Sequence, residues 1–380
     1  MTNFHAPTRE ELQTSLLSWY NREKRSLPWR ETRDPYKIWV SEIMLQQTTV
    51  QTVIPRWKRF LERFPTVQTL AQATEEEVLA LWLGLGYYSR ARNLWKAARL
   101  VTEELGGEIP TAFEGLLALP GMGRYTASAV ASIAYAEPVA VLDANVERVL
   151  SRWHALSDEI RNPRVKRQLW EWADAVLVRD QAGDWNQAMM ELGALVCLPR
   201  NPRCEGCPVK KGCRAFDHGD PESYPNKGKK AESIAVREVA LLLERADGKL
   251  LGMQRSPKGS FALMWELPKV RCEGMEERLV AGSRLWESLG LGVGRVTAPV
   301  FEHRHVVMNT KIHLTVHRVE GDWKGEKPNL IAGMTGYEWM EPGEFLGRAI
   351  SSTMERVLKA IAGRTPEGIG EMENDGDFFG

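Results

Sequence analysis

The chain has 380 residues, more than one compact domain usually contains, and 43% of them are hydrophobic, so two or more units with separate cores are expected. The 50 basic residues balance the 50 acidic ones, and a net charge of zero gives no global attraction to nucleic acid or to a membrane surface. The polar start MTNFHAPTREELQTS lacks a signal peptide's apolar run, and no run of about 18 apolar residues predicts a membrane span. We therefore expect a cytoplasmic protein without a membrane partner.

Helical periodicity dominates residues 1–217. Apolar residues recur at spacings of three and four over 11–20, 38–50, 53–63, 75–83, 90–105, 125–135, 144–154 and 164–178. This part is predicted to be all-α. Pro, Gly and Lys then crowd into HGDPESYPNKGKKAES, and this composition predicts an interdomain linker over 218–233.

The remainder combines strands with helices. Residues 237–245 and 311–321 have the composition of strands, and DG at 247–248 is a hairpin turn signal. Helical spacing returns over 276–289 and 352–362. We expect an α+β domain over 234–362, followed by an acidic tail over 363–380 that is predicted to be disordered.

Within the helical part, Asp34 is a predicted N-cap and Pro35 the first residue of the helix that follows. Glu42 lies midway along this helix among apolar neighbours, where its pKa should rise toward that of a general acid, and Gln46 shares its face. An exposed helical glutamate is the alternative. Asp143 follows an apolar run and precedes a helical pattern, so it is either a simple N-cap or a functional carboxylate that also caps.

The stretch Leu-Pro-Gly-Met-Gly at 119–123 precedes a helix of small residues expected to start near Thr126. Gly121 and Gly123 are free to adopt positive φ and to point backbone N–H groups at one spot, which suits a phosphate. An ordinary pair of helices with glycine caps is the alternative.

Four of the five cysteines lie close together in the sequence with the spacing C-x6-C-x2-C-x5-C: Cys197, Cys204, Cys207 and Cys213. Clustered cysteines in a reducing compartment favour metal ligation over disulfides. Zinc, a [4Fe-4S] cluster and unligated thiols all remain open, although a single x2 pair between longer gaps favours the cluster. The cations in or beside this loop either bind DNA phosphates or only solvate its surface; they are Arg200, Arg203, Lys210, Lys211 and Arg214.

Taken together, these motifs resemble the endonuclease III superfamily of base-excision DNA glycosylases across residues 1–217. Within it, SEIMLQQT, LPWR, WLGLGYYSRARNL and MELGALVC are similar to the adenine DNA glycosylases. The resemblance implies a helix-hairpin-helix domain with a [4Fe-4S] cluster on the loop 197–213. It also implies a monomeric, nucleoid-associated enzyme that removes adenine mispaired with 8-oxoguanine or guanine in double-stranded DNA.

The resemblance further implies roles for single residues. Glu42 would protonate the flipped adenine, and Asp143, in a polar setting, would stay ionised to stabilise or trap the sugar cation. Tyr125 stands where endonuclease III carries the lysine that forms a Schiff base, so hydrolysis without strand cleavage is implied. Four further residues would support the pocket: Trp29, Arg30, Asn145 and Gln187. Gln47 and Tyr87 would wedge into the opened duplex. A purely structural role is the alternative for Arg30, Tyr87 and Gln187.

Residues 234–350 resemble a Nudix-type fold. When the metal-binding helix motif of that family is aligned on Gly290, this sequence retains only one of its three glutamates, Glu287. A domain that recognises the lesion strand is therefore favoured over a nucleotide pyrophosphatase. Thr310 is expected to contact 8-oxoguanine through its hydroxyl; a register shifted to Val307-Met308-Asn309 and a plain strand residue are the alternatives.

Two further readings remain for the whole chain: a glycosylase with lyase activity and another specificity, and a non-catalytic mismatch-binding protein. A sliding clamp or another repair protein is a candidate partner at the linker.

Overall fold

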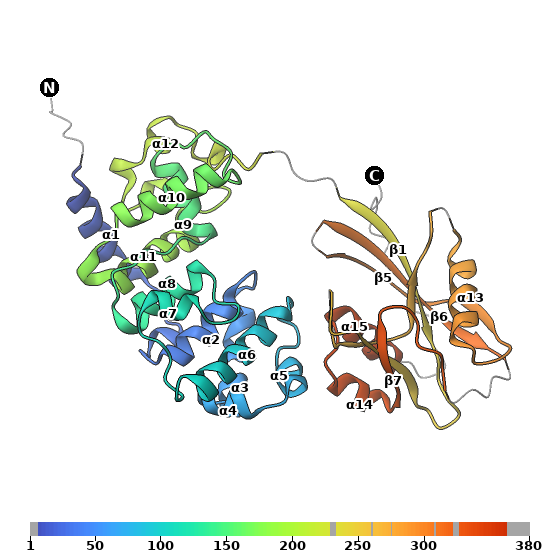
Figure 1. Ribbon diagram of the computed structural model, residues 1–380. Helices are drawn as coiled ribbons and strands as arrows, with labels where there is room; N and C mark the ends of the chain where they lie inside the picture. The colour runs from blue at the N-terminus through green and yellow to red at the C-terminus, as the bar shows by residue number, and fades with distance from the viewer. Residues whose placement is uncertain are drawn as a thin grey trace. The chain divides into compact units, whose positions relative to one another are not determined.

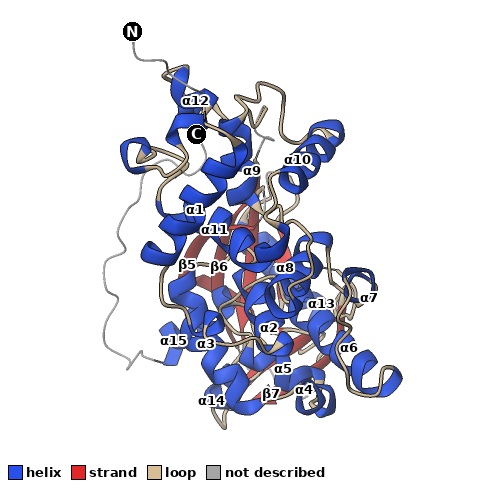
Figure 2. Cartoon of the chain, turned by 90° about the vertical axis from the view of Figure 1, so that its left-hand side faces the viewer, coloured by secondary structure: helices blue, strands red, loops and turns tan. Residues whose placement is uncertain are grey.

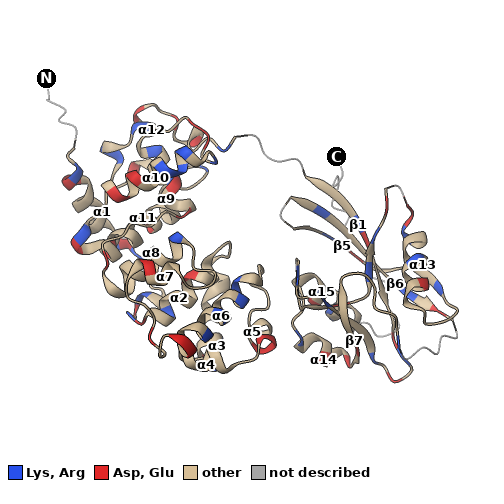
Figure 3. Cartoon of the chain, viewed as in Figure 1, with Lys and Arg blue, Asp and Glu red and all other residues tan. Residues whose placement is uncertain are grey.

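The computed structural model describes residues 7–228, 233–259, 261–274, 276–307, 309–321 and 327–362. Contacts divide the chain into two compact units, Met1–Ala73 with Ser89–Lys230 and Thr74–Tyr88 with Ala231–Gly380 (Figure 1). Both kinds of charge occur in both units (Figure 3). The tail 363–380, predicted to be disordered, lies outside the described residues. No helix among the described residues is long and apolar enough to cross a bilayer.

The first unit is all-α over its described residues, as predicted (Figure 2). Its helices are α1 (Arg9–Glu23), α2 (Pro35–Leu45), α3 (Val50–Arg63), α4 (Val67–Gln72), α6 (Ser89–Glu104), α7 (Phe113–Leu117), α8 (Arg124–Tyr135), α9 (Ala144–Trp153), α10 (Pro163–Ala175), α11 (Ala182–Leu195) and α12 (Arg214–Asp217).

Helix α2 lies in the core of this unit. Its start is the predicted one, because the Asp34 carboxylate accepts hydrogen bonds from the Tyr36 and Lys37 N–H groups and Pro35 is the first helical residue. Apolar side chains are buried on all its sides, and it packs against α3 and α8. The helix ends at Leu45, not at residue 50 as the apolar pattern predicted, because a turn separates it from α3.

Helix α11, which the periodicity analysis did not predict, packs against α1, α8 and α9. Two of its glycines permit this close approach. A Cβ on Gly183 would lie 2.6 Å from the Ser132 carbonyl oxygen, and one on Gly193 would lie 2.5 Å from Asn145 Cβ. These contacts bring α11 beside the last turn of α8 and the first turn of α9.

The first part of the predicted linker packs onto the helical unit. Arg152 Nε donates to the Tyr224 carbonyl at 3.0 Å, and the Ile160 N–H donates to the Asn226 carbonyl at 2.9 Å. The Asn226 side chain returns a hydrogen bond to the Ser157 carbonyl. Residues 218–228 are therefore part of the first unit, although their composition suggested a free connector, and 229–232 lie outside the described residues.

The second unit is α+β, as predicted. Its strands are β1 (Ile234–Leu242), β2 (Leu250–Arg255), β3 (Trp265–Glu266), β4 (Lys269–Arg271), β5 (Arg295–Val307), β6 (Thr310–Glu320) and β7 (Met334–Met340), and its helices are α5 (Glu75–Leu81), α13 (Arg278–Leu289), α14 (Pro342–Gly347) and α15 (Ser352–Ala362). One sheet has the order β4-β1-β6-β5, with β1 parallel to β6, and the other has the order β3-β2-β7.

Alternate residues of β1 pack into two cores on opposite faces of its sheet. Ala240 and Leu242 belong to the core that contains Met354 of α15, and Leu241 belongs to the core that contains Leu285 of α13. Helix α13 ends at Leu289, and its C-cap Gly290 has a φ of 66°, in the left-handed region that glycine favours. The single glutamate of the Nudix motif, Glu287, lies exposed on this helix.

Candidate active site

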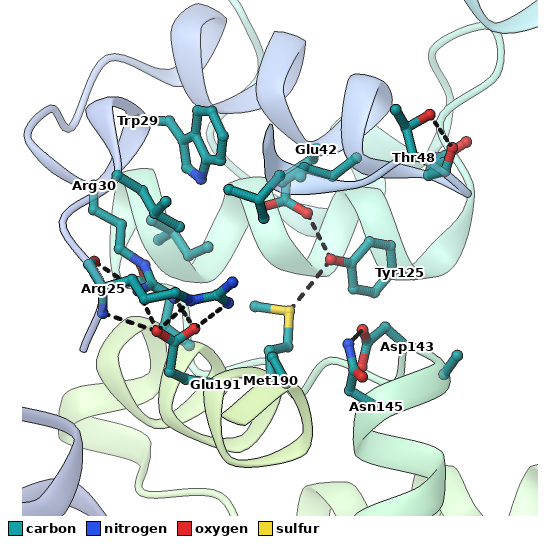
Figure 4. Close-up of a pocket in the computed structure, with 18 of the residues that line it drawn as sticks. Arg25, Trp29, Arg30, Glu42, Thr48, Tyr125, Asp143, Asn145, Met190 and Glu191 are labelled. Atoms are coloured by element: carbon teal, nitrogen blue, oxygen red, sulfur yellow. Dashed lines mark hydrogen bonds and ion pairs between the residues drawn. The ribbon is translucent and has the colours of Figure 1, made fainter. Parts of the chain in front are cut away.

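A cavity of about 800 Å³ in the first unit brings most of the predicted site residues together (Figure 4). This volume lies in the range of ligand-binding pockets. The predicted residues that line it are Trp29, Arg30, Glu42, Gln47, Tyr125, Asp143, Asn145 and Gln187. They come from the one-turn helix at 28–30, the end of α2 and the turn after it, the first turn of α8, the N-cap and first turn of α9, and α11.

Glu42 is the buried acid of this cavity. Its exposed fraction is 5%, so it is not the exposed helical glutamate of the alternative interpretation. Burial raises its pKa to about 7; the Tyr125 hydrogen bond and the Arg30 charge act to lower it, and the Asp143 charge adds to the rise. Its carboxyl group is therefore substantially protonated at neutral pH.

Tyr125, in the first turn of α8, holds the Glu42 carboxyl group in place. Its hydroxyl donates to Glu42 Oε2 at 2.6 Å, and its oxygen lies 3.3 Å from Met190 Sδ (Figure 4). Burial, and next the charge of Glu42, raise the pKa of Tyr125 well above its ordinary value. The phenol therefore stays neutral and acts as a donor.

Asp143 caps α9 and lines the cavity, so both of its predicted roles are compatible. Its carboxylate accepts 2.8 Å hydrogen bonds from the Val146 N–H and from Asn145 Nδ2. Burial raises its pKa, and these hydrogen bonds together with the nearby Arg148 charge only partly oppose the rise. This differs from the polar setting expected from the sequence, because the effect of burial exceeds that of the hydrogen bonds.

Arg148, one turn along α9, links Asp143 to the cysteine loop. Its guanidinium donates to Asn145 Oδ1 at 2.9 Å and to the Cys197 carbonyl at 2.8 Å, while Asn145 in turn donates to Asp143. The Nη2 atom that donates to Asn145 also donates to the Gly193 carbonyl at 2.7 Å. The orientation of the Asp143 carboxylate therefore depends on the position of the cysteine loop.

Arg30 forms part of an ion-pair cluster in the wall of the cavity. Arg30 Nη2 and Arg25 Nη2 lie 3.0 and 2.6 Å from the same Glu191 oxygen, and Glu191 is 1% exposed. Burial acts to raise the pKa of Glu191, but the hydrogen bonds from Arg25 and Arg30 lower it to about 2. The sequence analysis did not single out Arg25 or Glu191. Glu191 could have been found, because it lies four residues after Gln187 and therefore on the same face of one helix.

The two predicted wedge residues share an unusual backbone conformation. Gln47, in the first unit, has a φ of 57°, and Tyr87, in the second, has a φ of 47°. Both side chains are exposed, Tyr87 by 49%. A residue other than glycine held in the left-handed region costs on the order of 1 kcal/mol, and such positions cluster at functional sites.

The glycine hairpin before α8 agrees only in part with the sequence analysis. Gly121 has a φ of 73°, and a Cβ there would lie 2.4 Å from Asn93 Cβ, so only glycine fits. The prediction of a positive φ at Gly123 is wrong: its φ is −74°, and it is the N-cap of α8, which begins at Arg124 and not near Thr126. The capping position needs extended backbone, which explains the difference.

Comparison with known proteins agrees with this geometry. Residues 40–175 match the HhH-GPD superfamily of base excision DNA repair proteins, and residues 239–360 match the NUDIX domain. The human adenine DNA glycosylase is 37% identical over 93% of this chain and 74% of the relative, and the mouse protein of that name is 35% identical over 91% and 77%.

The chain belongs to the adenine DNA glycosylase family. A solved structure of a thermostable thymine-DNA glycosylase also resembles it, with a TM-score of 0.51 and 31% identity over 55% of this chain and 97% of that one. The chain is thus a base-excision DNA N-glycosylase with a second, Nudix-like domain.

The cysteine loop of this adenine DNA glycosylase family member gathers its thiols around one space. Cys197, Cys204, Cys207 and Cys213 are free thiols that line one cavity. Among the described residues, no group of three or more His, Cys, Asp or Glu side chains has the arrangement to hold a metal ion. Four thiols that line one space are the ligand set of a [4Fe-4S] cluster, and zinc accepts the same four ligands.

A buried cation lies beside these thiols. Arg152, 2% exposed, lines the same cavity, and its guanidinium donates to Cys197 Sγ at 3.3 Å and to the Leu198 and Pro199 carbonyls at 2.6 and 3.0 Å. Burying a guanidinium is costly unless an anion or hydrogen bonds compensate. A cluster held by four thiolates carries net negative charge and would supply that anion.

In the second unit, Thr310 is the first residue of β6 and pairs with Val307 of β5 and Ile234 of β1. The backbone position fits both the expected contact residue and the plain strand residue. Met308 of the shifted register lies outside the described residues. The assignment of Thr310 to lesion contact therefore stays a prediction.

Proposed function

We propose that this protein hydrolyses the glycosidic bond of adenine mispaired with 8-oxoguanine or guanine in duplex DNA, without cutting the strand. The observation that carries the proposal is the buried Glu42 carboxyl group, with a pKa of about 7, in one cavity with Asp143. Asp143 accepts two hydrogen bonds and lies near the Arg148 charge, which favour its ionised form relative to Glu42, so that the pair can supply an acid and an anion. Family membership supports adenine as the base removed.

The geometry suggests the following roles. Protonated Glu42 donates its proton to a ring nitrogen of the flipped adenine, and the bond between the sugar and the base breaks with its electron pair leaving on the base. The Asp143 carboxylate stabilises the resulting sugar cation, and water adds to the sugar carbon and releases one proton to solvent. Tyr125 carries no amine, so no imine forms at this position.

The proposal is tested by single-turnover base release from duplexes with adenine opposite 8-oxoguanine, guanine or thymine. Release opposite 8-oxoguanine and guanine, with the strand intact until alkali is added, is expected. Binding without release would favour the non-catalytic reading, whereas cleavage without alkali would favour a lyase. All duplexes are compared at one salt concentration, because phosphate contacts dominate DNA affinity and are weakened by salt.

We also propose that the four cysteines hold a [4Fe-4S] cluster whose role is structural. When bound, the cluster would fix the loop and balance the Arg152 charge. The exposed side chains of Arg200, Arg203, Lys211 and Arg214 would then face DNA phosphates, whereas Lys210 pairs with Glu205 at 2.7 Å. We further propose that Thr310 contacts 8-oxoguanine. The protein is proposed to be cytoplasmic and associated with the nucleoid, and to bind a sliding clamp near the linker.

Adenine release should fall as the pH rises through about 7. Burial raises the pKa of Glu42 to about 7, so the carboxyl group holds the proton it donates below that pH and loses it above. Above the pKa the acid form declines about tenfold for each pH unit. Single-turnover rates between about pH 6 and about pH 9 at constant salt measure the decline; a flat parental profile across this range would assign the acid to another group.

Tyr125→Lys should convert part of the activity into a covalent route. A lysine amine would lie beside the Glu42 carboxyl group, lower its pKa and so slow protonation of the base, while the amine attacks the sugar carbon. A borohydride-trappable protein-DNA adduct is expected for the variant and none for the parent. Tyr125→Phe serves as the matched control, because it also removes the hydroxyl but adds no amine. Trapping by the parent would contradict the monofunctional mechanism.

A further inference from the structure

Helix α2 ends in a tight turn that puts Gln47 where glycine is normally required. Gln46 has φ −59° and ψ 113°, Gln47 has a φ of 57°, and the Thr48 N–H donates to the Leu45 carbonyl at 3.3 Å. These values describe a type II turn with Gln47 at its third position, which favours Gly or Asn. The exposed Gln47 side chain therefore projects from a backbone conformation that glutamine disfavours.

Arg90 supplies a compensating interaction. It lies in the first turn of α6, and its Nη1 is 2.6 Å from the Ile43 carbonyl oxygen, 3.2 Å from that of Met44 and 2.6 Å from that of Gln46. The first two are carbonyls at the end of α2, which have no partner within the helix. The third belongs to the central peptide of the turn, and this peptide points the opposite way in a type I turn.

The placement of Arg90 is not explained by the stability of α6. A cation in the first turn of a helix opposes the helix dipole, whereas a cation at the last turn is favourable. Arg90 therefore stabilises the end of α2 at the expense of the helix that carries it. Its hydrogen bond to Gln46 also favours the peptide orientation that forces the following residue to positive φ.

We propose that Arg90 is a positioning residue that holds the Gln46–Gln47 peptide in the type II orientation and so fixes Gln47 for insertion into the duplex. The inference rests on the proposed function, in which Gln47 wedges into DNA while adenine is extruded. Arg90 touches neither the base nor the sugar in this account. It acts on the opening of the duplex, a step that precedes the proton transfer from Glu42.

The test compares Arg90→Met with the parent on two substrates, an adenine:8-oxoguanine pair flanked by matched pairs and the same pair flanked by mismatches. Single-turnover release from the matched duplex should fall by at least about tenfold, because a misplaced wedge slows opening. The defect should shrink when the flanking pairs are already weakened. An equal defect on both substrates would overturn the inference, because it would place Arg90 in folding or chemistry.

A double-mutant cycle with Gln47→Ala separates this role from general stability. If Arg90 acts through Gln47, Arg90→Met should cost little in the Gln47→Ala background, whereas additive losses would contradict the coupling. Arg90→Lys, which keeps a donor and a charge, should recover part of the rate. Arg99→Met, on the same helix but paired with Glu103, is the matched control and should behave as the parent. Absence of adenine release by the parent would instead refute the proposed function.

Discussion

The Glu42→Gln protein is expected to release adenine at least about a hundredfold more slowly than the parent while binding the duplex within about tenfold of its affinity. The amide keeps the shape of the side chain and can still accept the Tyr125 hydrogen bond, but it has no acidic proton to donate. Single-turnover release and equilibrium binding measure the two effects separately. A near-parental rate of release would show that another group is the acid.

The same substitution should change stability in a pH-dependent way. Glu42 has a folded pKa of about 7, above the ordinary 4.5, so its stabilising contribution is complete below about 4.5 and is lost as the pH rises through about 7. A glutamine does not titrate, so Glu42→Gln should have a higher Tm than the parent at about pH 8 and should lose this advantage at acidic pH. Glu62→Gln, at an exposed position on α3, removes the same charge and should show neither effect.

Arg152→Met is expected to lower both the iron content and the stability of the first unit. The substitution removes the donor of three part-buried hydrogen bonds, to the Leu198, Pro199 and Tyr224 carbonyls, and a typical hydrogen bond contributes about 0.5–1.5 kcal/mol. It also removes the cation beside the four thiols. Iron per chain, visible absorbance and thermal unfolding of the purified protein measure the loss.

Two further variants separate the contributions of Arg152. Arg152→Lys keeps the charge but not the planar set of donors, so an intermediate iron content is expected if both matter. Arg179→Met removes an exposed arginine paired with Asp174 and should leave iron content unchanged. Parental iron content and Tm in Arg152→Met would contradict the assigned role, and a colourless parent with stoichiometric zinc would contradict the cluster.

The sequence by itself determined the features that depend on near neighbours in the chain. Asp34 and Pro35 predicted the start of α2, and the helical spacing over 276–289 predicted the end of α13 at Leu289. The cysteine spacing and the four quoted stretches indicated the glycosylase superfamily, which the comparisons confirmed. Capping, helix periodicity and motif spacing are local properties, so they can be read without a fold.

Tertiary structure decided the properties that depend on distant residues. The pKa of Glu42 depends on its burial and on Tyr125, 83 positions away, and the Arg30 side chain is paired with Glu191, 161 positions away. The Gln46 carbonyl in the turn accepts a hydrogen bond from Arg90, which lies on another helix. Burial and ion pairing are set by which helices pack together, and the electrostatics of this site therefore become visible only when α2, α8, α9 and α11 surround one cavity.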